Sequence, residues 1–375
     1  MIISILLFIG GLILVLLGAN WLTDGASALA RRFKISELVI GLTIVALGTS
    51  LPEFVISMGA ALKGSPGIAL GNVIGSNVFN TLLILGTAAL ITPIKFNSKM
   101  LSREIPFNLL SAIALTLVAG GMLFAESGEG QYITRNGGLL LLCFLAVFIR
   151  YTFSIANDGS NTADEENASA MGMGKILICI AGGLAALIFG GNIFVDSATE
   201  MATAIGLSEA VIGITIVSVG SSLPELAVSV NAARKGNVGI ALGNVLGSNI
   251  LNIFFILGCA ATICPIELSE FKYVDFYVLI TTAILLYFIG KFGGKTTITR
   301  IEGAFFICCY IAYTIYLIST ELAALEEISK MCGEVKSKKD DKTASTPLIT
   351  VSDLQKLKLF EAIIIRLRKY PFKTK

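Results

Sequence analysis

The sequence predicts an all-α integral membrane protein with ten transmembrane helices, arranged as two inverted five-helix repeats. Three observations support this fold class. Hydrophobic residues make up 55% of the 375 residues and charged residues only 14%, whereas soluble domains carry about 25% charged residues. Apolar stretches of membrane-spanning length follow one another along the chain. Finally, the second half of the chain repeats the first. This composition excludes a soluble enzyme, a nucleic-acid binder and a disordered scaffold.

Ten apolar stretches define the expected spans. They fall at residues 2–22, 38–62, 67–92, 105–124, 137–156, 174–194, 210–233, 239–263, 273–290 and 303–319. They divide the chain into a first five-helix repeat (1–156), a polar linker (157–172), a second, inverted five-helix repeat (173–319) and a polar basic C-terminal tail (320–375). Within the tail, residues 352–369 are basic and amphipathic, which fits a surface-lying helix and a solvated extension equally well.

The distribution of Lys and Arg predicts the orientation. With ten crossings, thirteen Lys and Arg fall on one side of the membrane and three in the loops of the other. Because cytoplasmic loops carry the excess of positive charge, we expect both termini outside and the linker 157–172 in the cytoplasm, in a cell (inner) membrane. The tail adds twelve basic residues on the outer side, but long tails largely escape this rule.

An internal repeat dominates the sequence. Residues 36–93 align on 208–265, an offset of 172, with 36 identities in 58 positions and no gap. The opening segment also belongs to the repeat, because Gly18, Asn20 and Asp24 match Gly190, Asn192 and Asp196. Since each unit holds five spans, an odd number, the second copy enters the membrane upside down. Inverted repeats of this kind are typical of secondary transporters, which bind substrate near the midplane between the copies.

The repeated core places one carboxylate in each copy deep inside an apolar helix. It reads GTSLPE at residues 48–53 and GSSLPE at 220–225, ending in Glu53 and Glu225. An ionised carboxylate in the membrane costs several kcal/mol unless it has a partner, and no Lys or Arg lies at comparable depth. A cation from solution is the natural partner. Pro52 and Pro224 should open each helix and turn carbonyl oxygens inward.

Hydroxyl and amide side chains surround the two glutamates in the pattern. Thr49 and Ser50 share a helix face with Glu53, because they precede it by four and three residues. The next helix of each repeat adds a Ser and an Asn spaced by four residues. These pairs are Ser76 with Asn80 and Ser248 with Asn252. Such oxygens suit hard cations such as Na⁺ and Ca²⁺. For four further amides, helix–helix hydrogen bonding is at least as good an interpretation: Asn72, Asn77, Asn244 and Asn249. The structural interpretation is favoured for Ser57 and Ser229.

Other chemistry finds little support in the sequence. There is no histidine, and the seven cysteines lack metal-site spacing. We therefore expect no catalytic residues, no enzyme activity and no resident cofactor, with transported cations as the ligands. The expected surroundings are the lipid bilayer, without nucleic acid and without an evident need for a protein partner.

At these residues the sequence closely resembles the sodium/calcium exchanger family of cation/calcium antiporters. The paired segments G-[TS]-S-L-P-E and G-N-V-[IL]-G-S-N look like the two alpha repeats of that family, and the resemblance covers roughly residues 1–319. It implies Na⁺/Ca²⁺ exchange by alternating access, in which the first and sixth spans slide against the ligand-bearing bundle.

The resemblance also implies a ligand set. Ca²⁺ would be bound by Glu53 and Glu225 with the backbone carbonyls of Thr49 and Ser221. Na⁺ would use side chains around the same carboxylates and two outer carbonyls. The sodium side chains are Ser50, Ser76, Asn80, Ser222, Ser248 and Asn252, and the outer carbonyls are those of Ala46 and Ser218. Some relatives, including potassium-dependent ones, carry Asp at the position of Asn252, so Asn here resembles the potassium-independent branch.

Several alternatives remain open from the sequence. Two ionised glutamates balance one Ca²⁺ or two Na⁺, so a third Na⁺ would make the exchange electrogenic, and the resemblance favours 3 Na⁺ to 1 Ca²⁺. The nearest rival is a Ca²⁺/H⁺ antiporter that uses the same two glutamates. A cation channel and a non-transporting scaffold fit the broken helices and buried carboxylates less well.

Overall fold

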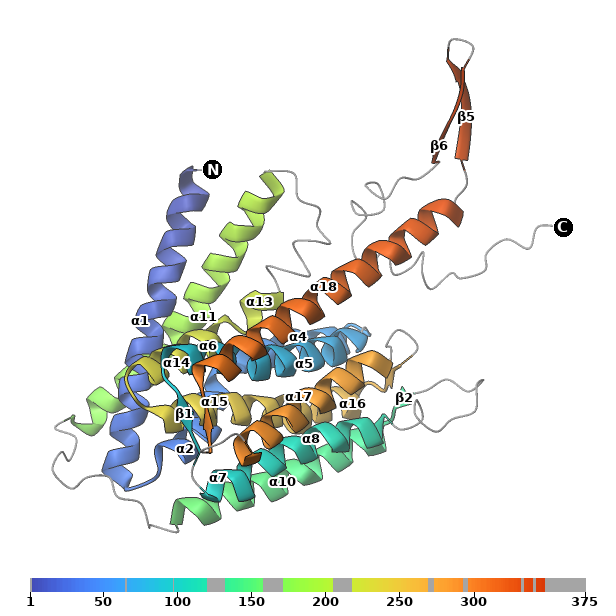
Figure 1. Ribbon diagram of the computed structural model, residues 1–375. Helices are drawn as coiled ribbons and strands as arrows, with labels where there is room; N and C mark the ends of the chain where they lie inside the picture. The colour runs from blue at the N-terminus through green and yellow to red at the C-terminus, as the bar shows by residue number, and fades with distance from the viewer. Residues whose placement is uncertain are drawn as a thin grey trace. The chain divides into compact units, whose positions relative to one another are not determined.

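The structure is a computed structural model, and it describes residues 2–64, 66–96, 98–119, 132–157, 171–204, 218–268, 273–292, 296–331, 334–339 and 342–347. The described residues are mostly helical (Figure 1). The α-helices are α1 (Ile2–Phe33), α2 (Glu37–Ile40), α3 (Ala46–Thr49), α4 (Leu51–Leu62), α5 (Gly67–Val78), α6 (Leu85–Ile91), α7 (Ser98–Ser102), α8 (Glu104–Val118), α10 (Arg135–Asn157), α11 (Met173–Ala204), α13 (Ser218–Ser221), α14 (Leu223–Arg234), α15 (Val238–Leu251), α16 (Gly258–Ile263), α17 (Tyr273–Phe292) and α18 (Arg300–Met331). Three π-helical stretches, η1 (Gly41–Val45), η2 (Phe79–Ile84) and η5 (Asn252–Leu257), continue α-helices without interruption.

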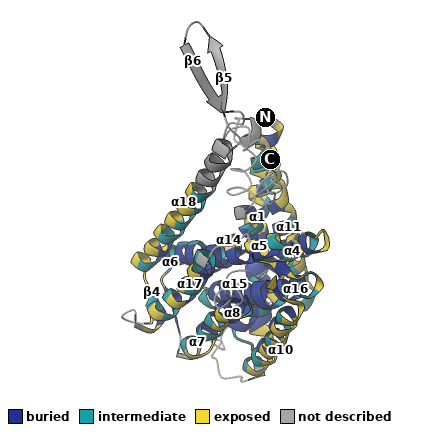
Figure 2. Cartoon of the chain, turned by 90° about the vertical axis from the view of Figure 1, so that its right-hand side faces the viewer, coloured by how far each residue is buried: buried dark blue, intermediate teal, exposed yellow. Residues whose placement is uncertain are grey.

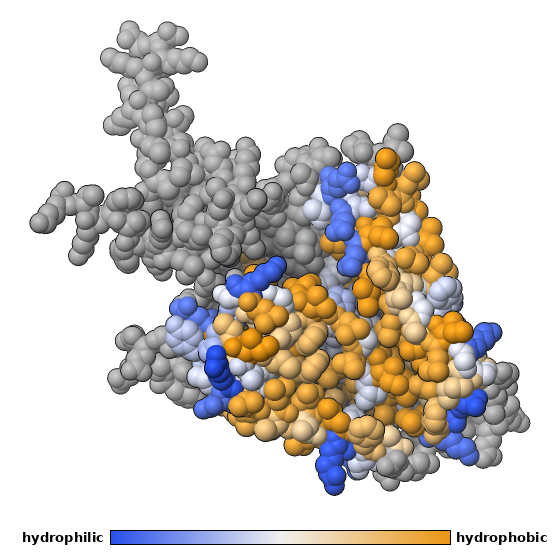
Figure 3. Space-filling view, turned by 180° about the vertical axis from the view of Figure 1, so that it is seen from behind, coloured by the Kyte–Doolittle hydropathy of each residue, from blue (hydrophilic) through white to orange (hydrophobic). Residues whose placement is uncertain are grey.

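The helices have the length and composition of membrane spans. Eight helices of the described residues pass that test: Ile3–Phe33, Gly67–Ile91, Met100–Val118, Arg135–Ala156, Met173–Met201, Val238–Ile263, Val274–Lys291 and Arg300–Leu317. A ninth candidate is the pair Glu37–Thr49 and Leu51–Leu62, bent by 49°. Hydrophobic residues cover much of the face seen in Figure 3. Among the exposed apolar side chains, Val55, Phe153 and Ile178 are 67%, 69% and 72% exposed. This is a multi-pass, membrane-type helical protein.

Two compact units make up the chain. One holds Gly10–Asn192 and Ser221–Tyr310, and it contains both predicted glutamates. The other holds Met1–Ile9, Ile193–Gly220 and Ile311–Lys375, where Phe8 stacks on Phe194 with ring centroids 4.4 Å apart. We call the first of these the glutamate-containing unit.

The buried centre of the glutamate-containing unit is built from two equivalent helices. They are the continuous runs α5–η2–α6 and α15–η5–α16, one from each sequence repeat. In the most apolar part of the second run 94% of the residues are buried, whereas 28% are buried in the corresponding part of α1. Figure 2 shows α15 among the most buried parts of the cartoon. The residues that carry the polar sequence motifs therefore lie in the interior, away from the lipid-facing surface.

Helices α1 and α11 cross at close range through glycines. A Cβ on Gly18 would lie 2.8 Å from the Gly183 carbonyl oxygen, and one on Gly190 would lie 2.9 Å from the backbone nitrogen of Val15. A Cβ on Gly25 would meet Ile180. Contacts nearer the C-terminus of α1 therefore involve residues nearer the N-terminus of α11, and the two helices run antiparallel. Small residues at such a crossing let backbones approach closely.

Two short strand pairs tie the ends of helices together. Strand β1 (Ile94–Lys95) pairs with β4 (Thr297–Ile298), and β2 (Tyr132–Ile133) pairs with β3 (Ile266–Glu267), both antiparallel. The first pair brings the start of α8 to the end of α17, and the second pair joins the segments at the opposite ends of these helices. Helices α8 and α17, the fourth helices of the two repeats, therefore also run antiparallel.

Several helices are longer than the apolar stretches that predict them. Helix α1 continues to Phe33, α11 to Ala204 and α18 to Met331, because hydropathy falls at the membrane boundary while helical backbone does not have to end there. Beyond α18, strands β5 (Glu334–Lys339) and β6 (Lys342–Pro347) form an antiparallel pair within the expected tail. Part of the expected seventh span (210–217), most of the linker (158–170) and the amphipathic segment 352–369 lie outside the described residues.

Candidate functional site

The predicted helix breaks are present in both repeats. Helix α3 ends at Thr49 and α4 begins at Leu51, and the intervening Ser50 has φ −82° and ψ 8°. In the second repeat Ser222 separates α13 from α14 with φ −93° and ψ 11°. In each case Pro occupies one of the first two positions of the second helix, where its missing N–H costs nothing. The prolines therefore start new half-helices directly before the glutamates.

The two predicted glutamates are buried and are bonded by hydroxyls of the opposite repeat. Glu53 and Glu225 are each about 1% exposed. Ser222 Oγ donates to Glu53 Oε1 at 3.0 Å, and Ser50 Oγ lies at the same distance, 3.0 Å, from Glu225 Oε1. The reciprocity of the contacts places the two helix breaks against each other at the centre of the unit.

The hydroxyls of the next helices extend this cluster. Ser50 Oγ also lies 3.0 Å from Ser248 Oγ, and Ser222 Oγ lies 3.3 Å from Ser76 Oγ. All four serines are buried. The sequence predicted each of them as a site residue, and the structure brings all four to the carboxylates.

Four buried oxygens of the cluster have no hydrogen-bond donor among the described residues. They are Glu53 Oε2, Glu225 Oε2, Asn80 Oδ1 and Asn252 Oδ1. All four are acceptors, and they form two equivalent pairs in the repeat. A buried acceptor without a donor is costly, and no Lys or Arg is among the buried side chains of the described residues. This arrangement is deficient in positive charge and in donors, which is the condition that a cation would relieve.

Both asparagines occupy π-helical stretches that the sequence did not predict. Asn80 is the second residue of η2 and Asn252 is the first of η5. Single π-helical turns inside α-helices often mark functional sites. Neither Gly nor Pro interrupts these two segments, so their composition gives no signal for the altered winding.

The four predicted carbonyl ligands belong to the half-helices before each break. In the first repeat, the Ala46 carbonyl accepts the Ser50 N–H at 3.0 Å and faces the Thr49 hydroxyl at 3.4 Å. In the second, Ser221 is the last residue of α13 and Ser218 is the first, and the side chain of Ser218 lies outside the described set.

The outer asparagines make hydrogen bonds between helices. Asn72 Nδ2 donates to Ser57 Oγ at 3.1 Å, and Asn244 Nδ2 donates to Ser229 Oγ at 3.0 Å. Asn244 Oδ1 also accepts from the Thr49 hydroxyl at 3.0 Å. For Ser57 and Ser229 this agrees with the structural interpretation favoured from the sequence.

Sequence reasoning missed a third buried carboxylate. Glu104 is 2% exposed and accepts a hydrogen bond from the Tyr151 hydroxyl at 2.8 Å. It is the first residue of α8, so the hydropathy pattern had placed it at a span end. Its tyrosine partner lies 47 positions away, which no local spacing could indicate.

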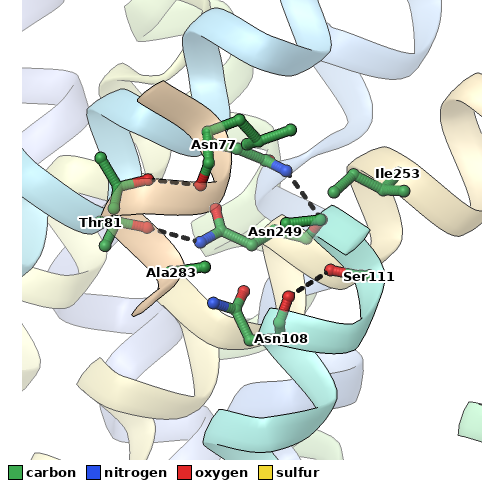
Figure 4. Close-up of a pocket in the computed structure, with 10 residues that line it drawn as sticks. Asn77, Thr81, Asn108, Ser111, Asn249, Ile253 and Ala283 are labelled. Atoms are coloured by element: carbon green, nitrogen blue, oxygen red, sulfur yellow. Dashed lines mark hydrogen bonds between the residues drawn. The ribbon is translucent and has the colours of Figure 1, made fainter. Parts of the chain in front are cut away.

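Residues of α5, α8, α15 and α17, among other segments, line a small polar cavity (Figure 4). Its polar lining is Asn77, Thr81, Asn108, Ser111, Asn249 and Thr282. The volume of about 10 Å³ is room for a single water molecule. Asn77 and Asn249 were predicted only as one of two interpretations, and the remaining polar lining residues were not singled out.

Comparison with known proteins assigns the family. The model of the family described as "Sodium/calcium exchanger protein" matches residues 3–154 and 175–319. The chain belongs to the sodium/calcium exchanger family. The resemblance inferred from the two repeated motifs is thereby confirmed, and with it antiport and ion transport as the class of activity.

Individual members of the exchanger family align over most of the chain. The sodium/calcium exchanger MaX1 of Methanosarcina acetivorans is 33% identical over 348 residues, covering 84% of this chain and 98% of MaX1. The inner membrane protein YrbG of Escherichia coli is 35% identical over 294 residues, or 76% and 88% of the two chains. A solved structure of the sodium-calcium exchanger NCX_Mj superposes with a TM-score of 0.72 at 34% identity, covering 84% of this chain and 98% of NCX_Mj.

A more distant relative is named for a different exchange. The Ca²⁺/H⁺ antiporter ChaA of Bacillus subtilis is 22% identical over 280 residues, covering 70% of this chain and 78% of ChaA.

Proposed function

We propose that this exchanger-family chain transports Ca²⁺ in exchange for Na⁺ at the cluster around Glu53 and Glu225. The observation that carries the proposal is the set of four buried acceptor oxygens without donors, two carboxylate and two amide, contributed equally by the two repeats. Hard oxygen ligands of this kind suit Na⁺ and Ca²⁺. An intramembrane carboxylate is kept only where it meets a partner or a cavity, and a transported cation supplies that partner.

Within this proposal the two ions share the carboxylates. Ca²⁺ is bound by Glu53 and Glu225 with the backbone carbonyls of Thr49 and Ser221. Na⁺ uses the surrounding hydroxyls and amides, with the outer carbonyls of Ala46 and Ser218. The sodium side chains are Ser50, Ser76, Asn80, Ser222, Ser248 and Asn252. The burial of all six side chains, and the hydrogen bonds that connect the four serines with the carboxylates, support the assignment.

The family resemblance favours exchange of 3 Na⁺ for 1 Ca²⁺, and charge arithmetic makes that stoichiometry electrogenic. Two ionised glutamates with one Ca²⁺ carry no net charge, and with three Na⁺ they carry one positive charge. Exchange of 3 Na⁺ for 1 Ca²⁺ therefore moves one charge per cycle, worth about 2.3 kcal/mol per 100 mV. Asn252, in place of a carboxylate, fits transport that does not need K⁺.

We propose ten spans in two inverted five-helix repeats as the architecture. The antiparallel crossing of the equivalent helices α1 and α11, and the antiparallel course of α8 and α17, support inversion. The seventh span, expected at residues 210–233, lies partly outside the described residues. Alternating access would then let α1 and α11 slide together against the bundle that holds the glutamates.

The proposed location is the cell (inner) membrane, with both termini outside and residues 157–172 in the cytoplasm. Asp24 and Lys235, which the charge count assigns to the same, cytoplasmic side, form an ion pair of 2.6 Å. That contact supports the relative orientation of the two repeats, while the sign of the whole orientation rests on the Lys and Arg bias.

A Ca²⁺/H⁺ antiporter is the alternative, since a relative of that name aligns with the chain. Two protons could neutralise the two glutamates as two Na⁺ would. Na⁺/Ca²⁺ exchange gives the hydroxyls and amides a role as Na⁺ ligands, whereas Ca²⁺/H⁺ exchange does not, because protons do not require them.

The test uses the full-length protein in Na⁺-loaded liposomes, with uptake of radiolabelled Ca²⁺ followed as the external Na⁺ is varied. Uptake should require the outward Na⁺ gradient. Because three Na⁺ leave for each Ca²⁺ that enters, an inside-positive potential should accelerate uptake and an inside-negative potential should slow it.

Each other result moves the assignment elsewhere. Uptake driven by a pH gradient and indifferent to Na⁺ would identify the proton-coupled branch. Uptake that needs no counter-ion would indicate a channel. Uptake that needs Na⁺ but ignores the potential would leave antiport and remove the 3:1 stoichiometry.

A further inference from the structure

The side-chain amides of Asn80 and Asn252 each donate a hydrogen bond to an asparagine of the opposite repeat. We call these two partners, Asn249 and Asn77, the holding asparagines. Asn80 Nδ2 donates to Asn249 Oδ1 at 3.1 Å, and Asn252 Nδ2 donates to Asn77 Oδ1 at 3.3 Å. All four side chains are no more than 2% exposed. An asparagine whose nitrogen is engaged in this way must present its oxygen on the other side, and these are the two amide oxygens without donors.

The holding asparagines are themselves anchored by further hydrogen bonds. Asn77 Nδ2 donates to the backbone carbonyl of Asn249 at 3.2 Å. Because a carbonyl can only accept, the Asn77 amide cannot be reversed, so its oxygen must face Asn252. Asn249 Nδ2 donates to Thr81 Oγ1 at 2.9 Å, which leaves the Asn249 oxygen for Asn80.

The cavity of Figure 4 lies next to the holding asparagines. It is lined by Asn77, Asn249 and Thr81, and neither Asn80 nor Asn252 belongs to its lining. Asn108 lines the same cavity from α8, and within the described part of the chain no hydrogen bond joins its side chain to the holding asparagines. The holding asparagines thus separate the ion-facing amides from a polar space, and Asn108 offers a neighbour that does not take part.

We propose that Asn77 and Asn249, with Thr81, are positioning residues that keep the amide oxygens of Asn80 and Asn252 turned toward transported Na⁺. The inference rests on the proposed function, in which these two amides serve Na⁺ and not Ca²⁺. We call the hydrogen bonds made by Asn77, Asn249 and Thr81 the brace. Without the brace, each amide of Asn80 and Asn252 can rotate and present its NH₂ group, which repels a cation. The brace therefore sets selectivity through Na⁺ affinity, while the Ca²⁺ ligands stay in place.

Thr81, which accepts the hydrogen bond of Asn249, gives the cleanest variants. Thr is uncharged, and Val has nearly the same shape. Thr81→Val removes the hydroxyl that accepts from Asn249, and Thr81→Ser retains it. The repeat has Ile253 at the equivalent position, so an apolar side chain of this size is compatible with the fold. Asn77→Ala removes the other holding group, and Asn108→Ala alters the same cavity without touching the brace.

The experiment measures two midpoints in the full-length protein: the Na⁺ concentration that half-displaces bound radiolabelled Ca²⁺, and the Ca²⁺ concentration for half-saturation without Na⁺. Loss of one hydrogen bond corresponds to about a tenfold change in affinity. Thr81→Val and Asn77→Ala should raise the Na⁺ midpoint about tenfold and leave the Ca²⁺ midpoint within about twofold. Thr81→Ser and Asn108→Ala should leave both near the wild-type values.

Two outcomes would overturn the proposal. Equal weakening of Na⁺ and Ca²⁺ would mean general structural damage, and an unchanged Na⁺ midpoint in both Thr81→Val and Asn77→Ala would mean that the amides need no brace. Glu53→Gln is included to keep the two proposals apart. If Glu53→Gln still binds Ca²⁺, the proposed function fails; if Ca²⁺ binding is lost there but the brace variants behave as wild type, only the brace fails.

Discussion

Ser50 and Glu225 lie in different repeats, 175 positions apart, yet the Ser50 hydroxyl is 3.0 Å from the Glu225 carboxylate. The equivalent bond, from Ser222 to Glu53, has the same length. Each glutamate is therefore oriented by the helix break of the other repeat. The site exists only when both repeats are packed together, so the two halves of the ligand set cannot vary independently.

This reciprocity predicts equal effects at equivalent positions. Ser50→Ala and Ser222→Ala each remove one hydroxyl bonded to a carboxylate, and hydrogen bonds to charged groups are worth about 1.5–3 kcal/mol. Each variant should weaken Ca²⁺ binding by about tenfold or more, and the two should agree within about threefold. Equilibrium binding of radiolabelled Ca²⁺ measures this. A strong loss in one variant and none in the other would contradict the symmetric site.

Removing either carboxylate should abolish the stabilisation of the fold by Ca²⁺. A ligand that binds only the folded state stabilises it by about 2.7 kcal/mol at a hundred times its Kd. We expect the wild type to melt at a higher temperature with Ca²⁺, and Glu53→Gln and Glu225→Gln to show no shift. Glu200→Gln, at an exposed position of α11, should keep the full shift. A normal Ca²⁺ shift in either glutamine variant would remove that glutamate from the site.

Much of this arrangement could be predicted from the sequence because its causes are local or repeated. Pro52 marks a half-helix start wherever it stands in an apolar run, and the break before it is present. An ionisable side chain such as Glu53 is conspicuous between apolar residues, so it could be selected as a candidate without tertiary information, and the structure places it among the buried residues. The family followed from the same two motifs and is confirmed.

The remainder depends on distances across the fold. Asn77 and Asn249 are identical in type to asparagines that only join helices, and their hold on Asn252 and Asn80 depends on packing between repeats. Glu104 finds its partner Tyr151 on another helix. Helix ends were also set too early, because hydropathy reports the membrane boundary and not the end of the hydrogen-bonded backbone.

Introducing a third carboxylate should add proton sensitivity. In Asn252→Asp a third carboxylate joins Glu53 and Glu225 in the proposed ligand set, so a third negative charge must be balanced by a cation or a proton when the site empties. Because the protonated acid cannot attract Na⁺, exchange by this variant should fall more steeply than the wild type as the pH is lowered. The rate of Na⁺-dependent Ca²⁺ uptake from pH 8 to pH 5 measures this. Superimposable pH profiles would argue against Asn252 as a site residue.

The ion pair between Asp24 and Lys235 offers a test of helix sliding. It joins α1 to the residue after α14, and its side chains are 46% and 29% exposed, so it is worth at most about 1 kcal/mol and can break in each cycle. A permanent link should not break. In a cysteine-free background, Asp24→Cys with Lys235→Cys should lose exchange when joined by a short, reducible thiol cross-linker and regain it on reduction. Full exchange in the cross-linked protein would mean that α1 does not move relative to α14.

The crossing of α1 and α11 can be tested with two adjacent glycines. A Cβ on Gly183 would lie 2.7 Å from the backbone nitrogen of Leu22, whereas one on Gly182 would meet only the Trp21 ring, at 3.8 Å. Overpacking against backbone costs about 1–3 kcal/mol, and Ala in place of an unconstrained helical Gly costs nothing. Gly183→Ala should therefore lower the melting temperature and slow exchange, while Gly182→Ala should leave both near the wild-type values. Thermal unfolding in detergent and Ca²⁺ uptake in liposomes measure the pair. If the two variants behave alike, close backbone contact does not hold these helices together, and their movement as one unit loses its structural basis.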